Sequence, residues 1–176
     1  TNVPEFRNLE GFEDHDINML YFWNQAGKLI AMTIEVACTA QEVENDYSVN
    51  ADYWHPVRTK LRQKYGSNLC ILGWIGASGD QSPHLMYRKD AEERMRKLSK
   101  LSRLDEIARR VVNAVNEAYD VVKNDRHADV PLIHKTEKLS LPMRLVTESE
   151  YAEAKAESEK IASQIASDPK LKDEIE

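Results

Sequence analysis

A glycine-rich loop carries most of the side chains in this sequence that are suited to chemistry. Residues 73–84 read GWIGASGDQSPH and contain three glycines, two serines, an aspartate, a glutamine and a histidine. The glycines at Gly73, Gly76 and Gly79 let the backbone approach a ligand closely, and N–H groups in such a loop can cradle an oxyanion or a phosphate. Residue types therefore favour a functional loop, although Asp80 also suits a structural turn because its carboxylate can accept backbone N–H bonds.

The loop matches none of the common phosphate or nucleophile motifs. It has neither G-x-x-x-x-G-K-[ST] nor the glycine spacing of the dinucleotide fingerprint. Ser78 lies one position short of a G-x-S-x-G nucleophile elbow. A serine nucleophile also needs a base within about 3 Å, and the spacing of Ser82 and His84 does not by itself place them together. The chemistry of the loop therefore depends on what the fold brings beside it.

Three apolar runs are predicted to form the sheet that holds this loop. Residues 17–23 and 28–37 are β-rich and flank a turn sequence at residues 24–27, so they predict a hairpin. The run 28–37 is nearly all apolar, which suits a central strand. Residues 69–72 lead into the loop, and their uninterrupted apolar character favours a strand buried on both faces.

A helix is expected between the second and third strands. In residues 51–65 the apolar side chains recur at helical spacing, with Asn50 or Asp52 available to cap the helix and Gly66 to end it. A strand-helix-strand connection is right-handed in nearly all cases and makes the two strands parallel. The polar residues 38–42 should then lie beside the glycine loop, at the edge where ligands bind in open α/β sheets.

The remainder of the chain is predicted to be mostly helical. A short charged helix is expected over residues 88–99, and a longer helix that begins near Ser102 should pack on the sheet. Residues 130–144 are bracketed by two prolines and are expected to form an edge strand, since proline cannot serve a central ladder. Residues 147–166 predict a C-terminal helix with a thin apolar face.

Together these elements predict an α/β fold with a packed core. The expected architecture is a mixed sheet with a β-hairpin, a right-handed βαβ crossover, packing helices and a C-terminal helix. Residues 1–145 should form the α/β domain and residues 146–176 a loosely attached C-terminal helix. The 41% hydrophobic content, with only six glycines and six prolines, agrees with a core of ordinary size.

Charge and cysteine content restrict the classes of partner. The 24 basic and 30 acidic residues give a formal charge of −6, which argues against nucleic acid or an anionic membrane as the main partner. The basic cluster at residues 94–103 has helical spacing and is interpreted as a solvated helix face. No apolar run approaches the roughly 20 residues that span a bilayer. Cys38 and Cys70 lie in apolar contexts and are interpreted as buried thiols.

One segment of the loop resembles a known enzyme family. Residues 79–84, GDQSPH, resemble the G-D-V-S-P-N segment of neutral ceramidases, zinc-dependent amidohydrolases that cleave the N-acyl bond of ceramide. The resemblance covers roughly residues 17–119 and looks closest to an uncharacterised bacterial branch with similar D-x-W-H and G-D-Q-S-P-H-L segments. It implies a small-molecule or lipid-like amide substrate and a secreted or periplasmic location.

The resemblance also implies roles for individual residues. Ser82 corresponds to the serine of the family's amidase chemistry and Asp80 to its partner in the motif, and His84 is the third candidate catalytic residue. Cys38-Thr39-Ala40 stands where the family's metal-binding His-Pro falls, so no metal ligand is assigned in this chain and zinc is expected only in the full-length protein. The candidate substrate-binding residues on the two polar loops are Gly76, Ser78, Gly79, Gln81, Gln41 and Glu42.

Two functional hypotheses of different classes follow. In the first, the chain is an excised central fragment of a ceramidase-like amidohydrolase, inactive by itself, whose site is completed by the remainder of its own chain. In the alternative, the scaffold is a non-catalytic module that holds an anionic or carbohydrate ligand, or a purely structural domain. The first hypothesis requires residues 38–42 and 78–84 to converge on one cleft.

Overall fold

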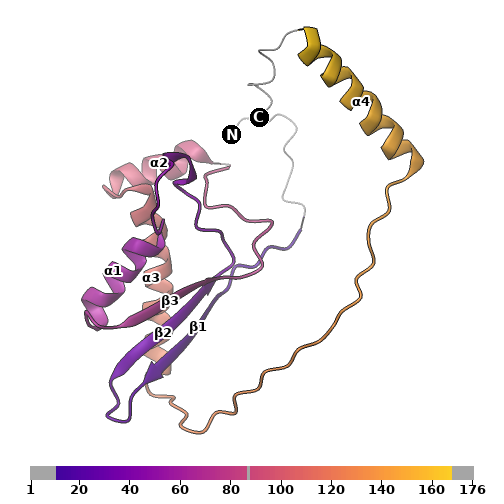
Figure 1. The fold of residues 1–176 in the computed structure, drawn as a ribbon. Coiled ribbons are helices and arrows are strands. Elements are labelled where there is room, and N and C mark those ends of the chain that lie inside the picture. Colours follow the sequence, from indigo (N-terminus) through magenta and orange to yellow (C-terminus); the bar gives the residue numbers. More distant parts are fainter. Residues whose placement is uncertain (1–10, 87, 168–176) are drawn as a thin grey trace. The chain divides into compact units, whose positions relative to one another are not determined.

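Alternating apolar residues build the sheet of this protein, for which a computed structural model describes residues 11–86 and 88–167. The strands are β1 (Ile17–Trp23), β2 (Leu29–Val36) and β3 (Cys70–Ile75), in the sheet order β1-β2-β3 (Figure 1). β1 pairs antiparallel with β2, and β2 pairs parallel with β3. The predicted mixed sheet, with its hairpin and its central strand, is therefore confirmed.

The hairpin turn forms where the sequence predicts it. Gly27 has a φ of +75°, a value that favours glycine, and its N–H donates to the Asn24 carbonyl at 2.9 Å. The Asn24 side chain also closes the turn by accepting the Lys28 N–H at 2.9 Å. The register of β1 and β2 shifts between Phe22 and Trp23, so the ladder is irregular close to this turn.

Helix α1 (Trp54–Tyr65) connects β2 to β3 and allows the two strands to run parallel. It ends as predicted at Gly66, whose φ is +125° and whose N–H donates to the Arg62 carbonyl at 2.9 Å. The helix begins three residues later than residue 51, and no side chain caps its first turn, so the predicted capping role of Asp52 is wrong. Asp52 instead supports the loop before the helix.

Helices α2 (Lys89–Leu98) and α3 (Arg103–Val122) follow β3, as the sequence predicts. Ser102 caps α3, because its Oγ accepts the Asp105 N–H at 3.0 Å. The Tyr21 hydroxyl donates to the Val115 carbonyl at 3.0 Å and so links β1 directly to α3.

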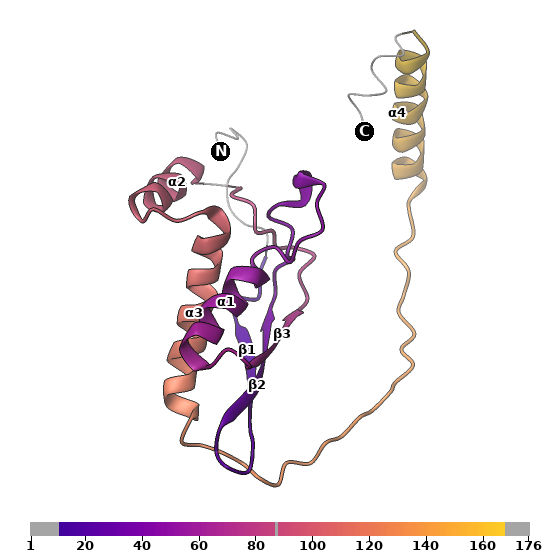
Figure 2. The same cartoon turned by 60° about the vertical axis from the view of Figure 1, so that its left-hand side comes forward.

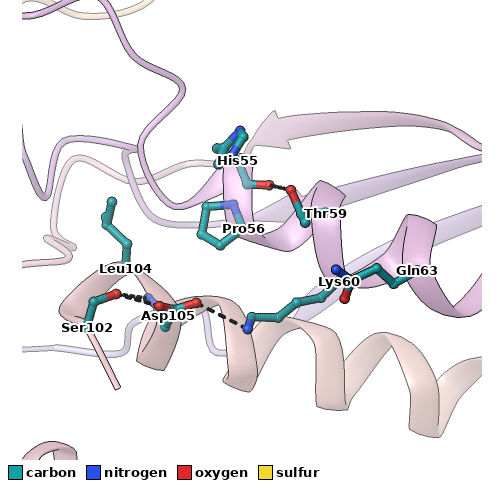
Figure 3. Close-up of a pocket in the computed structure, with 8 residues that line it drawn as sticks. All are labelled: His55, Pro56, Thr59, Lys60, Gln63, Ser102, Leu104 and Asp105. Carbon is teal, nitrogen blue, oxygen red and sulfur yellow. Dashed lines mark hydrogen bonds and ion pairs between the residues drawn. The ribbon is translucent and has the colours of Figure 1, made fainter. Parts of the chain in front are cut away.

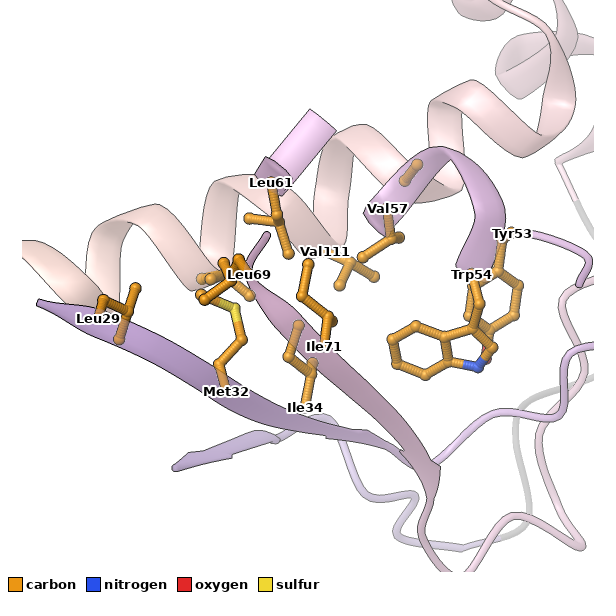
Figure 4. Packing of buried hydrophobic residues seen from close by; sticks show 12 residues of the cluster. Leu29, Met32, Ile34, Tyr53, Trp54, Val57, Leu61, Leu69, Ile71 and Val111 are labelled. Carbon is orange, nitrogen blue, oxygen red and sulfur yellow. The ribbon is translucent and has the colours of Figure 1, made fainter. Parts of the chain in front are cut away.

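The core of the first compact unit, Thr1–Ala128, lies between the sheet and helices α1 and α3. Figure 4 shows aliphatic side chains from the strands meeting those from the two helices, with the Trp54 ring at one end. The buried cluster comprises Leu29, Met32, Ile34, Tyr53, Trp54, Val57, Leu61, Leu69, Ile71, Ala108, Val111 and Val115.

Helices α1 and α3 pack on the same face of the sheet (Figure 2), and within the described part of the first unit no element covers the other face. Along β3, Ile71 faces the helices and is 6% exposed, whereas Leu72 and Trp74 are 46% and 50% exposed. The expectation that β3 is buried on both faces is therefore wrong. Burial of both faces needs a second layer, and the described part of the first unit supplies one layer only.

The second compact unit, Asp129–Glu176, contains helix α4 (Glu148–Ser167). Its predicted capping box is present. The Thr147 N–H donates to Glu150 Oε2 at 2.9 Å, and the Glu150 N–H donates to Thr147 Oγ1 at 3.3 Å. The helix has no buried side chain, which agrees with the thin apolar face expected from its sequence.

Residues 130–144 form no strand, so the predicted edge strand is wrong. All of these residues are exposed. Apolar residues alternate in the sequence, but a strand also needs a neighbour that satisfies its backbone groups, and alternation alone cannot supply one. Among the residues that the structure describes, no helix is both long and apolar enough to cross a bilayer.

Candidate functional site

The two polar loops leave the sheet at the same edge. The Gly76 N–H donates to the Val36 carbonyl at 3.1 Å and continues the parallel pairing of β2 and β3 to its end. Residues 37–46 and residues 76–84 therefore start side by side. This confirms the predicted juxtaposition of the segments that follow the two strands.

Arg103 connects these loops to helix α3. Its Nε donates to Glu42 Oε1 at 3.1 Å, and its Nη2 donates to the carbonyl of the buried Pro83. Arg103 is the first residue of α3, so one side chain joins the end of β2, the glycine loop and the helix. The basic cluster interpreted from sequence as a solvated helix face thus contains a residue that faces the candidate site.

Glu42 is an enclosed carboxylate on the rim that residues 37–46 and 76–84 form at this edge of the sheet. Its side chain is 12% exposed, and burial raises its pKa, an effect that the neighbouring Arg103 partly offsets. Within the described part of the chain, Glu42 Oε2 and Thr39 Oγ1 are buried and have no hydrogen-bond partner. These two atoms could each accept a hydrogen bond from a donor group of a ligand.

His84, on the loop after β3, lies near acidic residues of the loop after β2. Its Nε2 lies 3.8 Å from Glu44 Oε1, at the start of a short 3-10 helix (Glu44–Asp46). The imidazole also interacts electrostatically with Glu42 and acts to lower the pKa of that carboxyl. An imidazole near carboxylates suits general acid-base chemistry.

Ser82 and Gln81 mainly stabilise the loop in this structure. Ser82 Oγ accepts the His84 N–H at 3.2 Å, and Gln81 Nε2 donates to the Asp14 carbonyl at 2.6 Å. Asp80 is exposed. Among the described residues no hydrogen bond joins Ser82 Oγ to a side-chain base, so the serine is not arranged as an activated nucleophile.

The remaining predicted substrate contacts differ in how accessible they are. Gly79 has open space where a side chain would stand, with nothing within 4 Å of an added Cβ. Gly76 has no such space, because an added Cβ would lie 2.9 Å from Glu35 Oε1. The Ser78 carbonyl accepts the Gln81 N–H at 3.2 Å, and the Gln41 carbonyl accepts the Glu44 N–H at 3.4 Å, so their backbones shape the two loops.

Gly73 has a packing role rather than a ligand-binding one. An added Cβ there would lie 2.5 to 2.7 Å from atoms of the Trp54 ring. The expectation that this glycine lets the backbone approach a ligand is therefore wrong, because the indole already occupies the space. The glycine is needed for close contact between β3 and the start of α1.

Two further residues hold the loop after β2, and sequence reasoning missed one of them. The hydroxyl of the buried Tyr53 donates to the Cys38 carbonyl at 2.6 Å, and burial raises the pKa of Tyr53 far above its usual value. Asp52 accepts the Val43 N–H at 3.0 Å and the Tyr53 N–H at 2.7 Å. The D-x-W-H segment therefore fixes the rim as well as starting α1.

The residues of this rim do not form a zinc site. Cys38 Sγ donates to the Thr39 carbonyl at 3.7 Å, and burial raises the pKa of this thiol, whereas zinc binds the thiolate. In the described ranges no three His, Cys, Asp or Glu side chains come together as metal ligands. Cys38 is half-buried, but Cys70 is exposed, so the expectation of a buried thiol at residue 70 is wrong.

A separate hollow of about 350 Å³ lies between α1 and the start of α3 (Figure 3). The ion pair of Lys60 Nζ and Asp105 Oδ1, 3.1 Å apart, lies along it, and His55 lines one end. None of the predicted catalytic or substrate-binding residues lines this hollow. It is therefore distinct from the rim formed by the two loops.

The comparisons with known proteins give no indication of function, so the geometry of the rim is the main evidence for it. No family model, curated protein or solved structure matches this chain.

Proposed function

We propose that this chain supplies active-site loops to a ceramidase-like amidohydrolase that cleaves an N-acyl amide bond. The observation that carries the proposal is the link from Glu42 through Arg103 to Pro83, which places the Ser82–His84 segment beside an enclosed carboxyl group. Amide hydrolysis needs a polarised carbonyl and a proton donor for the leaving amine. The rim offers groups that could deliver a proton to the leaving amine.

Glu42 and His84 are the proposed proton carriers. Burial raises the pKa of Glu42 and Arg103 partly offsets this effect, so the carboxylate could accept a proton during the reaction and pass it to the departing amine. His84 would exchange protons with this carboxyl and with solvent. The open backbone at Gly79 would allow a substrate carbonyl to approach the loop N–H groups.

The chain by itself is expected to lack activity. Ser82 Oγ accepts a backbone N–H, and no three metal-ligating side chains converge among the described residues, so the proposal assigns activation of the attacking water to residues outside this chain. The proposed partner is accordingly the remainder of a longer protein, and the proposed substrate is a small-molecule or lipid-like amide.

The test uses the full-length protein that contains this chain and a fluorogenic long-chain N-acyl amide. Glu42→Gln and His84→Gln should each lower kcat/KM by at least 100-fold, whereas Ser48→Ala, at an exposed serine, should leave it within twofold. Cleavage that survives Glu42→Gln unchanged would contradict the role of the carboxyl. No cleavage by the full-length protein, with or without added zinc, would overturn the hydrolase proposal.

A non-catalytic binding module is the second candidate. It is favoured by the hydrogen bond from the His84 N–H to Ser82 Oγ, which stabilises the loop but does not activate the serine. Under this alternative, acetate or phosphate would shift the amide NMR signals of residues 78–84 without any turnover in the full-length protein. Asp80→Asn and Ser82→Ala variants that leave every ligand interaction intact would point instead to a structural domain.

A further inference from the structure

The sheet face opposite the helices is mostly apolar, and no element in the described part of the first unit covers it. Residues that pair across a sheet point to the same side, so the pairs Leu20–Thr33 and Thr33–Leu72 place three side chains in one row across this face. Phe22 and Trp74 lie on the same side, two positions along their strands. The exposed fractions are 60% for Leu20, 44% for Phe22, 46% for Leu72 and 50% for Trp74. These four residues define the open face.

The open face has two ridges and a valley. Its large side chains stand on the outer strands β1 and β3, whereas the central strand β2 contributes the small residues Ala31 and Thr33 between them. Such a surface is complementary to a copy of itself. When one copy is turned about a two-fold axis so that the strands of the two sheets cross, the ridges of each lie across the valley of the other.

Charge does not oppose such a contact. The chain carries a formal charge of −6, but Glu35 is the one ionisable carboxylate among the described β2 residues on this face. Glu35 lies at one end of the face, opposite Trp74 in the register and beside Gly76. A two-fold arrangement can therefore keep the two copies of this carboxylate apart.

The edge of the sheet at β3 is less available than the face. Arg58 Nε donates to the Ile71 carbonyl at 3.3 Å, and Arg62 Nε donates to the Leu69 carbonyl at 3.1 Å. These guanidinium groups satisfy carbonyls that an added strand would need. Extension of the sheet through β3 is thereby disfavoured, and packing on the face is favoured.

The size of the open face agrees with a weak, specific contact. Its exposed side-chain surface is on the order of 500 Å², toward the upper end of the apolar patches found on monomers. Two copies packed on each other would bury roughly 1,000 Å² in total, which is where specific interfaces begin. We infer that the open face is a dimerisation surface on which a second copy of this chain packs face to face. The inference does not depend on the proposed hydrolase role.

Sedimentation velocity between about 1 and 300 µM tests this inference. The mass should rise with concentration from 20.2 kDa toward twice that value, with a dissociation constant in the micromolar range. Leu72→Lys should weaken dimerisation at least tenfold. Leu98→Lys is the matched control, because Leu98 is 69% exposed on α2, away from the sheet, and it should leave the dissociation constant unchanged. Circular dichroism would establish that both variants are folded.

A second measurement distinguishes this surface from other modes of association. Cys70 lies in the row of Phe22 and Ala31 on the open face and is exposed in the monomer. Its alkylation by a bulky maleimide, followed by peptide mass spectrometry, should slow several-fold at high concentration in the wild type but not in Leu72→Lys. A monomer at 300 µM would overturn the inference and assign the face to another partner. Equal weakening by Leu98→Lys would also overturn it.

Discussion

The Glu42 carboxylate and the Arg103 guanidinium form an ion pair, with Nε and Oε1 3.1 Å apart, that joins residues 61 positions apart in the chain. Both side chains are largely enclosed, at 12% and 22% exposure, so solvent screens the pair less than a surface ion pair. The second Arg103 hydrogen bond, to the Pro83 carbonyl, makes the arginine the shared support of both loops.

Replacement of this arginine should loosen both loops together. Arg103→Gln removes the charge beside Glu42 and leaves an enclosed carboxylate without its cation, which we expect to cost about 1–3 kcal/mol at neutral pH. Amide hydrogen exchange should accelerate at least tenfold in residues 38–46 and 78–84 and remain unchanged in α1. Arg94→Gln, at an exposed residue of α2, is the control. Acceleration in only one loop would show that Arg103 does not couple them.

The buried hydroxyl of Tyr53 should contribute separately to the rim. Tyr53→Phe leaves the Cys38 carbonyl without its donor at 2.6 Å and should lower the free energy of unfolding by about 1–3 kcal/mol. The same change at Tyr47, which is 97% exposed, should have an effect below about 0.5 kcal/mol. Urea denaturation of the two variants gives the comparison. A Tyr53→Phe variant as stable as the wild type would show that this hydrogen bond does not stabilise the rim.

The contact of Gly73 with the Trp54 ring should tolerate no side chain. Gly73→Ala would place a methyl group 2.5 to 2.7 Å from ring atoms, and the resulting overpacking should destabilise the protein by about 1–3 kcal/mol. Gly79→Ala is the matched control, because nothing lies within 4 Å of the added atom, and its thermal midpoint should match the wild type. If Gly73→Ala is equally neutral, the strand and the helix do not pack as closely as the structure indicates.

Local signals predicted the strands and helices of the first unit well. The run 17–23 predicts β1 with its bounds, and Ser102 and Gly66 mark the ends of two helices because caps act within one turn. Residues 130–144 show the limit of this reasoning. Whether an alternating segment pairs depends on an available neighbour, and the burial of β3 likewise depends on how many layers the chain provides.

The location of the candidate site was predictable, but its supports were not. Parallel strands bring their ends together, so the meeting of the loops after β2 and β3 follows from topology. Arg103 lies in a basic cluster that resembles a solvated helix face, and only the fold turns it toward Glu42. Tyr53 resembles an ordinary core residue. Its place directly after Asp52, before the helix, was the one available signal.

The carboxylate of Glu106, which is 7% exposed on α3, should make the stability of the protein depend on pH. Hydrogen bonds from Arg109 and Arg110 lower the pKa of Glu106 from 4.5 to about 2, with the Arg109 bond the larger cause. Because the folded pKa is depressed, the stabilisation is fully present above about pH 4.5 and is lost as the pH falls toward 2.

Glu106→Gln should therefore destabilise the protein by about 1–3 kcal/mol at pH 7, with the arginine contacts discounted for their exposure to solvent. The difference from the wild type should shrink as the pH falls below about 4.5. Glu117→Gln, on the exposed side of the same helix, should show no such trend. Urea denaturation at several pH values measures the difference. If it stays constant from pH 7 down to pH 3, the charge of Glu106 is not what its arginine neighbours stabilise.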